Sequence, residues 1–304
     1  MIEVKKDSLP LSVAEVENHI LYGDVLDCLR VVPDKCVHVV ACSPPYNLSL
    51  NYGNYSDNAP WKDYLEWLFK VWQECCRVLV SGGRLVINID SITNRQDPDE
   101  SGEYIRPILA ELVFQMRKIP GMMYRAEITW AKDTVVGRAT AWGSWMSASN
   151  PIIRRNHEHL LTWSKDTWRI EGDSELSDMT RKEFEQWTMS TWYITPETRN
   201  LGGHPAAYPE ELVRRIIKLY SYRGNIILDP FSGTGTTCAV ALREGRKYIG
   251  IDNYLPYVEF AEKRIKKEES MNSLTGAYEP RSSRLKSSKK STIKRDKETE
   301  MDML

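Results

Sequence analysis

Residues 43–46, which read Ser-Pro-Pro-Tyr and are called the tetrad below, combine groups suited to holding an amine. Pro44 and Pro45 have fixed φ angles and no N–H groups, so the carbonyls beside them accept hydrogen bonds without nearby competing donors. The Ser43 hydroxyl adds another acceptor, and the ring of Tyr46 offers a face on which a planar base can stack. The tetrad therefore predicts a site that holds the NH₂ group of a flat ring.

An exocyclic NH₂ group on cytosine or adenine is a weak nucleophile because its lone pair is delocalised into the ring. Acceptors that take both hydrogens draw the nitrogen toward tetrahedral geometry and free the lone pair to attack an electrophilic methyl group. The same acceptors stabilise the positive charge that develops on the nitrogen. A base stacked in a duplex cannot reach such a site, so this chemistry requires a flipped nucleotide.

Residues 228–237, which read LDPFSGTGTT and are called the glycine turn below, predict a ligand that contains a nucleoside. Gly233 and Gly235 allow a tight turn and a close approach of the backbone to a ligand. The helix that follows offers unpaired N–H groups and a partial positive charge. Asp252 ends the next apolar run, where an acid in a β-α-β unit accepts hydrogen bonds from a ribose.

The residues of the glycine turn separate the candidate ligands. The turn lacks the lysine of a nucleoside triphosphate loop, and Cys238 stands where the dinucleotide pattern needs a glycine. Asp229 would repel a pyrophosphate but suits a cation. S-adenosylmethionine carries an ammonium, a sulfonium and a ribose, so it is the predicted cofactor. A nicotinamide-dependent oxidoreductase is an alternative that leaves the tetrad unexplained, and a tight turn without a ligand is another.

The elements that must position these segments alternate between strand and helix. Apolar runs typical of strands occupy residues 19–22, 37–42, 84–89, 225–228 and 247–251, and residues 124–130 and 157–163 also have the pattern of strands. Helical spacing covers residues 61–79, with Gly82 and Gly83 as the stop, and then 103–118, 209–222, 236–244 and a segment that begins at Pro256. This alternation predicts an α/β fold with a doubly wound, mostly parallel sheet, in which the tetrad directly follows a buried strand.

The composition of the 304-residue chain is typical of a globular protein, with a net charge of −1, 41% hydrophobic and 27% charged residues. No apolar run approaches the ~18 residues that span a bilayer, and the start lacks the apolar core of a signal peptide. We therefore expect a soluble, cytoplasmic protein. The six cysteines form no CxxC pair, so we expect neither a metal site nor a disulfide framework.

With the tetrad ahead of the glycine turn, residues 19–268 resemble the β group of amino-directed DNA methyltransferases, which make N4-methylcytosine or N6-methyladenine. The resemblance implies the class I S-adenosylmethionine-dependent methyltransferase fold, that cofactor, and double-stranded DNA with one flipped base as the substrate. It implies catalytic roles for Ser43, Pro44, Pro45 and Tyr46. It implies cofactor binding by Asp24, His204, Asp229, Pro230, Phe231, Gly233, Gly235, Thr236, Thr237, Asp252 and Asn253.

The first residue of the tetrad bears on which amine is methylated. In the family that the chain resembles, Asp at this position is typical of adenine-N6 enzymes and Ser of cytosine-N4 enzymes. Ser43 therefore predicts a cytosine-N4 DNA methyltransferase that protects DNA in a restriction-modification system, with adenine N6 as the alternative. Methylation at C5 is not expected, because the sequence contains no Pro-Cys dipeptide. A DNA-binding regulator on the same fold, without catalysis, is a third hypothesis.

The resemblance also divides the chain into a catalytic half (1–132), a target-recognition region (133–203), a cofactor-binding half (204–269) and a basic tail (270–304). The recognition region is rich in aromatic and basic side chains, which suit DNA contacts, although burial in a core also explains tryptophans. These side chains are Trp142, Trp145, Trp163, Trp168, Trp187, Trp192, Arg138, Arg154, Arg155, Arg169, Arg181 and Arg199.

The tail holds 8 Lys/Arg and 5 Asp/Glu, a net charge of +3, against −4 for the rest of the chain. Its few large apolar residues predict disorder, either as a solvated terminus or as an arm that contacts phosphates. Relatives of the β group are often dimers, so a homodimer is an expectation, although the sequence has no interface signature.

Overall fold

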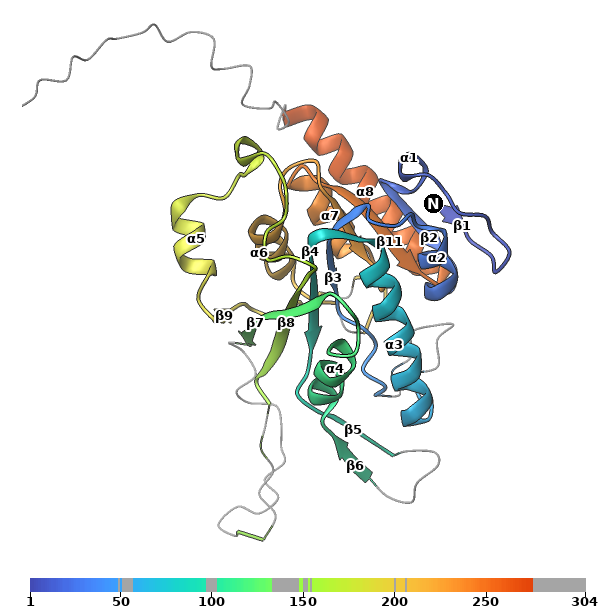
Figure 1. The fold of residues 1–304 in the computed structure, drawn as a ribbon, viewed down its shortest axis with the longest axis vertical. Helices are drawn as coiled ribbons and strands as arrows, with labels where there is room; N and C mark the ends of the chain where they lie inside the picture. Colours follow the sequence, from blue (N-terminus) through green and yellow to red (C-terminus); the bar gives the residue numbers. More distant parts are fainter. Residues whose placement is uncertain are drawn as a thin grey trace, which may run out of the picture.

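The computed structural model describes residues 1–48, 50, 57–96, 103–132, 148–149, 153, 155–199, 201–205 and 207–275. Within these ranges, nine strands form one central sheet (Figure 1). In sheet order the strands are β1 (Ile2–Glu3), β2 (His19–Tyr22), β11 (Lys247–Asp252), β10 (Ile226–Asp229), β3 (Val37–Cys42), β4 (Leu79–Ile89), β8 (His157–Lys165), β7 (Met122–Ala131) and β9 (Thr191–Tyr193). Every pairing is parallel except the two made by β8, so the expected mostly parallel sheet is confirmed.

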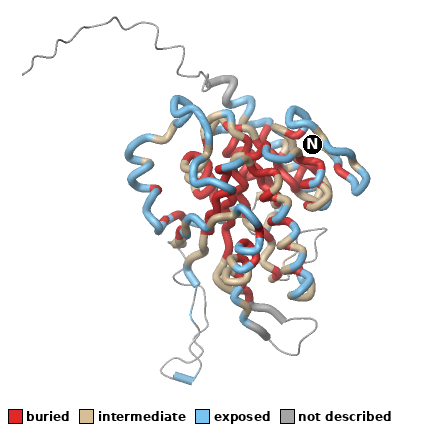
Figure 2. The backbone as a smooth tube through the Cα atoms, viewed as in Figure 1, coloured by how far each residue is buried: buried red, intermediate tan, exposed pale blue. Residues whose placement is uncertain are grey.

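Helices cover both faces of this sheet (Figure 1). On one face lie α2 (Val25–Val31), α3 (Trp61–Val78) and α4 (Ile108–Met116). On the other lie α5 (Arg181–Trp187), α6 (Glu210–Tyr220), α7 (Thr236–Arg243) and α8 (Leu255–Thr275). Short helical turns occur at α1 (Val13–Val16) and η1 (Ser174–Leu176). The two helical layers bury both faces of the central strands (Figure 2), which explains why these strands are mostly apolar.

Strand β3 illustrates how the sequence pattern builds the two cores. Val40 and Cys42 pack into the core beneath α2 and α3, whereas Val39 and Ala41 face α6 and α7. This alternation follows from the period of two along a strand, with both sets fully or almost fully buried.

The structure corrects two predictions about helix limits. Residues 103–106, predicted as helix, form strand β6 (Glu103–Arg106), which pairs with β5 (Thr93–Gln96), and the helix starts only after Pro107. Gly82 and Gly83 do not stop the preceding helix, since α3 ends at Val78 and β4 runs through both glycines. They lie where the β3–β4 register is irregular, and a Cβ on Gly82 would lie 2.0 Å from the carbonyl oxygen of Arg169. The glycine is therefore required by close packing.

The order of the strands creates one switch point. From β3 the chain passes through α3 to β4 on one side, and from the adjacent β10 it passes through α7 to β11 on the other. Because β3 and β10 are parallel, their carboxyl ends meet at the same edge of the sheet. Open α/β sheets bind their ligands in the crevice at such a point. The tetrad follows β3 and the glycine turn follows β10, so the fold brings these two segments together.

In the part of the chain that the structure describes, no helix is long and apolar enough to cross a membrane. All six cysteines are buried and free. Residues 270–275, which belong to the predicted tail, continue α8, and the remainder of that tail lies outside the described residues.

We expect Gly82→Ala to lower the free energy of unfolding more than Gly224→Ala does. Both glycines have left-handed φ angles, +74° and +81°, so alanine carries a similar strain of about 1–2 kcal/mol at each position. Only Gly82 has a backbone atom in the way of the added methyl group; at Gly224 nothing lies within 4 Å. Urea unfolding of the two variants measures the difference, and equal losses of stability would contradict the packing role of Gly82.

Candidate active site

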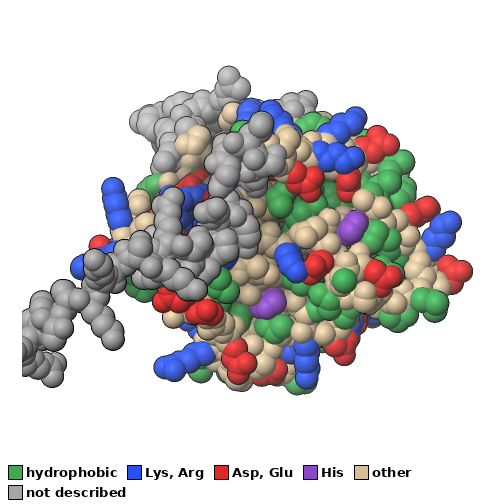
Figure 3. Space-filling view, turned by 90° about the horizontal axis from the view of Figure 1, so that it is seen from above, with side chains coloured by type: hydrophobic (Ala, Val, Ile, Leu, Met, Phe, Trp, Pro, Cys, Tyr) green, Lys and Arg blue, Asp and Glu red, His purple; other side chains and the backbone are tan. Residues whose placement is uncertain are grey.

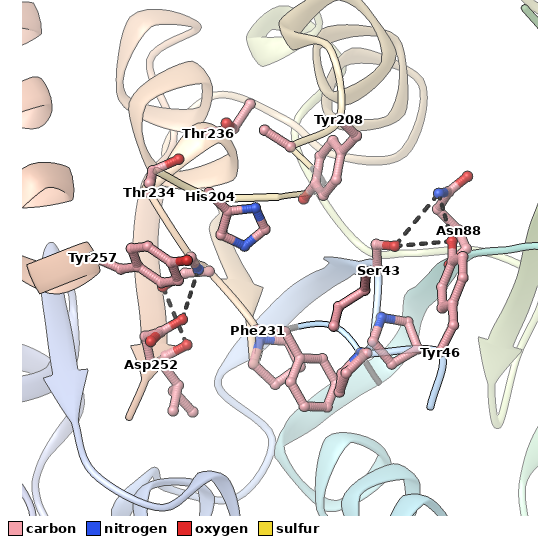
Figure 4. Close-up of a pocket in the computed structure, with 18 of the residues that line it drawn as sticks. Ser43, Tyr46, Asn88, His204, Tyr208, Phe231, Thr234, Thr236, Asp252 and Tyr257 are labelled. Carbon is pink, nitrogen blue, oxygen red and sulfur yellow. Dashed lines mark hydrogen bonds between the residues drawn. The ribbon is translucent and has the colours of Figure 1, made fainter. Parts of the chain in front are cut away.

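A cavity of about 420 Å³ opens at the carboxyl ends of β3, β10 and β11. It brings together the whole tetrad and most of the residues predicted to bind a cofactor. Figure 4 shows Ser43 and Tyr46 of the tetrad with His204, Phe231, Thr236 and Asp252 around this cavity. The predicted residues on its wall are Asp24, Ser43, Pro44, Pro45, Tyr46, His204, Pro230, Phe231, Gly233, Thr236, Asp252 and Asn253. Asp229, Gly235 and Thr237 do not line it.

The hydroxyl groups of the tetrad belong to one hydrogen-bonded network. The Ser43 Oγ lies 3.1 Å from the Tyr46 hydroxyl, which is 3.2 Å from Glu158 Oε2 and 3.2 Å from the carbonyl oxygen of Asn88. The Asn88 amide nitrogen donates to Glu158 over 2.6 Å and to the Tyr46 oxygen over 3.1 Å. Burial of the hydroxyl, and then the charge of Glu158, raise the pKa of Tyr46 well above its usual value. Tyr46 is therefore a neutral phenol at physiological pH.

Hydrogen bonds with α3 and with Asp57 hold the loop that carries the tetrad in place. The Tyr64 hydroxyl on α3 donates to the carbonyl oxygen of Pro45 over 2.8 Å. The carboxylate of the buried Asp57 accepts the N–H groups of Asn47 and Leu48, each over 2.8 Å. These bonds hold Asn47 at a φ of +57° and set the direction in which the chain leaves the site.

Asp229 supports the glycine turn from beneath the cavity. Its carboxylate accepts the N–H of Phe231 over 3.0 Å, the Tyr208 hydroxyl over 2.9 Å, and the Thr237 hydroxyl. Burial raises the pKa of Asp229 to about 6, while the three hydrogen bonds act in the opposite direction. Gly235 lets the glycine turn pack closely against α8, because a Cβ at this position would lie 2.6 Å from the Cβ of Ala261.

Asp252 holds the other end of the glycine turn and also faces the cavity. Its Oδ2 accepts the N–H of Gly233 over 2.9 Å and its Oδ1 accepts the N–H of Tyr254 over 2.8 Å. Burial raises the pKa of Asp252 to about 6. This carboxylate lies at the place where a β-α-β unit receives a ribose.

His204 closes the cavity above the glycine turn. Its ring lies 4.9 Å from that of Tyr257, and a Cβ on Gly233 would approach its Nε2 to 2.8 Å. Burial lowers the pKa of His204 to about 4, so the imidazole is neutral at physiological pH. The glycine thus lets the histidine pack directly on the turn (Figure 4).

The charges on the cavity wall fit a cationic cofactor. The acidic residues that line it are Asp24, Asp90, Glu158, Glu197 and Asp252. Among the described lining residues the one basic side chain is Lys132, which pairs with Glu158. Asp90 pairs with Arg155 and Glu197 with Arg199, two arginines that do not line the cavity. The carboxylates of Asp24 and Asp252 on the cofactor side disfavour a pyrophosphate and suit the ammonium and sulfonium of S-adenosylmethionine, so the residues present fit the predicted cofactor.

Residues 37–263 match the family model of N6/N4 DNA methylases. The chain belongs to the N6/N4 DNA methylase family. As a member, it is a DNA methyltransferase with S-adenosylmethionine as its cofactor. Membership in this family argues against the two alternative functions, a nicotinamide-dependent oxidoreductase and a DNA-binding regulator without catalysis.

Individual relatives agree over most of the chain. The type II methyltransferase M.MjaVI of Methanocaldococcus jannaschii is 32% identical over 174 residues, which cover 57% of this chain and 84% of the relative. The DNA adenine methyltransferase YhdJ of Escherichia coli K12 is 30% identical over 81% of this chain and 82% of the relative. The structure of TTHA0409 from Thermus thermophilus, complexed with S-adenosyl-L-methionine, is similar to this fold, with a TM-score of 0.66. The match covers 83% of this chain and 94% of TTHA0409, at 28% sequence identity. The DNA methylase therefore has the class I methyltransferase fold, as expected.

Several residues of the site lie outside the predicted set. Asn88 and Glu158 contact the tetrad, while Tyr208, Lys132 and Tyr257 also line the cavity. A signal for Asn88 exists in the sequence, because it is the one polar residue in the apolar run 85–89 and it is 3% exposed. Glu158 carries no comparable signal, since charged residues are common near the start of a strand.

Within the predicted recognition region, some of the aromatic side chains are buried in the cores and others are exposed. Trp163, Trp187 and Trp192 are buried in the cores, whereas Trp168 is 53% exposed. Strands β8 and β9 from this region belong to the main sheet. Trp142, Trp145, Arg138 and Arg154 lie outside the described residues. On the face drawn in Figure 3, acidic and basic side chains are interspersed, which agrees with the low net charge.

Among the described residues, no group of three or more His, Cys, Asp or Glu side chains could hold a metal ion.

We expect the affinity of the methylase for S-adenosylmethionine to be about tenfold lower at pH 5 than at pH 7.5. Below a pKa of about 6 the Asp252 carboxylate is protonated and loses the charge with which it would accept a ribose hydroxyl. Asp229, whose pKa is also about 6, is protonated over the same range and holds the glycine turn less firmly. Asp252→Asn should weaken binding at pH 7.5 and reduce the dependence on pH. Calorimetric titration measures both effects, with Asp27→Asn as the control because Asp27 pairs with Arg30 outside the cavity. An affinity that does not change between the two pH values would contradict this role.

Proposed function

We propose that the protein transfers a methyl group from S-adenosylmethionine to the exocyclic N4 of a cytosine in duplex DNA. The observation that carries this proposal is the Ser43 hydroxyl at the first position of the tetrad, in the cavity that also holds the glycine turn. In the family that the tetrad resembles, Ser at this position is typical of cytosine-N4 enzymes.

The tetrad activates the amine through hydrogen bonding. Ser43 Oγ and the carbonyl oxygens before and within the proline pair, those of Ser43 and Pro44, accept the hydrogens of the NH₂ group, which raises the nucleophilicity of the nitrogen. These fixed acceptors also stabilise the positive charge on the nitrogen in the transition state. The ring of Tyr46 stacks on the base, and its hydroxyl is held by Asn88 and Glu158, so the ring cannot turn away.

The other half of the cavity holds the cofactor, which supplies an electrophilic methyl group. Asp252 accepts the ribose hydroxyls, and Asp24 contacts the region of the adenine. The neutral His204 encloses the methionine part without adding a positive charge next to the sulfonium. Asp229, Gly235 and Thr237 keep the glycine turn in shape.

The substrate is double-stranded DNA with one flipped base, because the tetrad lies at the wall of a cavity that a stacked base cannot enter. We infer that the surface part of residues 133–203 reads the recognition sequence. Relatives named type II methyltransferases support a role in a restriction-modification system in the cytoplasm. A homodimer stays a prediction from the resemblance.

Methylation of adenine at N6 is the second candidate. It is favoured by YhdJ, a DNA adenine methyltransferase that is 30% identical over 81% of this chain. Both bases present an exocyclic NH₂ group to the tetrad, so the same acceptors would serve either reaction.

The base is identified by incubating the protein and labelled cofactor with duplex DNA, digesting the product to nucleosides and analysing them by mass spectrometry. We expect N4-methylcytosine. Finding only N6-methyladenine would replace the first candidate by the second, and a lack of methylation on every DNA tested would contradict both.

The loss of stacking in Tyr46→Ala should by itself reduce methyl transfer by about tenfold to a hundredfold, because the stacking of a base on an aromatic ring contributes about 1–3 kcal/mol. The total loss should exceed that of a variant that keeps the ring. Cofactor affinity should change less than threefold, since Tyr46 lies on the side of the cavity opposite Asp252 (Figure 4). Tyr124→Ala, a change at an exposed ring on β7, is the control. A Tyr46→Ala enzyme of full activity would argue against stacking.

A further inference from the structure

Glu158 connects the tetrad to the second half of the sheet. It lies on β8, whereas the tetrad follows β3, Asn88 lies on β4 and Lys132 directly follows β7. Its Oε2 is 3.2 Å from the Tyr46 hydroxyl and 2.6 Å from the Asn88 amide nitrogen. Its Oε1 accepts the Lys132 ammonium. The carboxylate thus has a bond to the tetrad on one oxygen and an ion pair on the other.

The donors in this network have a definite direction. The Tyr46 hydroxyl has one proton, and a bond to a carboxylate is stronger than a bond to a neutral carbonyl, so the proton points toward Glu158 Oε2. The Tyr46 oxygen is then an acceptor for the Ser43 hydroxyl, 3.1 Å away. Asn88 Nδ2 donates a long bond of 3.5 Å to Ser43 Oγ, which occupies at most one lone pair. The other lone pair of Ser43 Oγ is left to accept a hydrogen from an amine in the cavity.

Methylation of an amine creates a proton that must leave. When the N–CH₃ bond forms, the amine nitrogen becomes positively charged, and a neutral product requires the loss of one N–H proton. Ser43 is a hydroxyl rather than a carboxylate, so it can pass a proton on but is a poor final acceptor. The group at the end of the chain of hydroxyls is Glu158.

We propose that Glu158 receives this proton through Tyr46 and Ser43, an inference that rests on the proposed function. The N–H proton passes to Ser43 Oγ as the Ser43 proton passes to the Tyr46 oxygen and the Tyr46 proton passes to Glu158 Oε2. The products are a neutral methylated amine, two unchanged hydroxyls and a neutral carboxylic acid. Glu158 acts through two other side chains, so it is a positioning residue. Its side chain is 14% exposed, which gives the proton a route to water.

The groups that surround the relay set its response to pH. Lys132 follows β7 and pairs with Glu158, and Asp90 directly after β4 adds a negative charge near Tyr46 and pairs with Arg155. His157 lies on the same strand as Glu158. Among these, Glu158 is the group that accepts the Tyr46 hydroxyl.

The test uses the full-length protein in single-turnover methyl transfer at saturating DNA and cofactor, after mass spectrometry has identified the wild-type product. Glu158→Gln keeps a hydrogen-bond acceptor for Tyr46 but cannot take the proton, and Tyr46→Phe keeps the stacking ring but interrupts the relay. Glu127→Gln is the matched control, because Glu127 on β7 pairs with His159 on β8 but does not line the cavity.

We expect Glu158→Gln and Tyr46→Phe each to lower the single-turnover rate about a hundredfold, with cofactor and DNA affinities within threefold of wild type. The double variant should lose no more than either single variant, because both changes interrupt one path. The deficit of Glu158→Gln relative to wild type should shrink at alkaline pH, as solvent base replaces the carboxylate. Glu127→Gln should behave as wild type.

A Glu158→Gln enzyme with the wild-type rate and pH profile would overturn the relay, and so would additive losses in the double variant. If Glu158→Gln does not fold, a fully active Tyr46→Phe enzyme would overturn it equally. A wild-type protein that methylates no DNA would instead contradict the proposed function. A product of N6-methyladenine leaves the relay intact, since either amine has the same proton to lose.

Discussion

The parallel pairing of β3 with β10 is the constraint on which the site depends. Ile227 and Leu228 stand beside Val39 and Val40 in the ladder, so the two strands end at the same edge of the sheet. Each strand is followed by a segment with little regular structure, the tetrad in one case and the glycine turn in the other. These segments are almost 190 positions apart in the sequence, yet they line one cavity. Burial of both sheet faces by helices fixes this register, because a slip of one residue would turn the apolar side chains of β3 to the wrong core.

Within the cavity, the two halves differ in the way they use charge. The cofactor side offers carboxylates and a neutral imidazole, an environment that tolerates a cation and disfavours phosphates. The tetrad side places neutral hydroxyls and proline-flanked carbonyls against the substrate, and keeps its carboxylate, Glu158, one hydroxyl further away. An amine in contact with Ser43 therefore meets acceptors without an adjacent full charge, while a proton acceptor lies within the same hydrogen-bonded network.

The segments that could be predicted from sequence are those whose pattern is local. The limits of β2 and β3 match the apolar runs 19–22 and 37–42, and α3 matches its predicted span to within one residue. Residues 103–106 could not be assigned correctly, because their pairing with residues 93–96 decides their structure, and the role of Gly82 depends on a contact with Arg169. In the site, motif residues such as Ser43 and Asp252 were predictable from their own segments. Glu158 was not, since its importance comes only from the neighbours that the sheet gives it.

The central claim is that the amine held by the tetrad meets the methyl group held over the glycine turn. A crystal structure of the protein with duplex DNA and sinefungin, an S-adenosylmethionine analogue with an amine in place of the transferred methyl, tests it most directly. We expect a flipped base against Tyr46, with its exocyclic nitrogen near Ser43 Oγ and about 3.5 Å from the analogue's amine. An analogue bound away from Asp252, or a base bound away from Ser43, would contradict it.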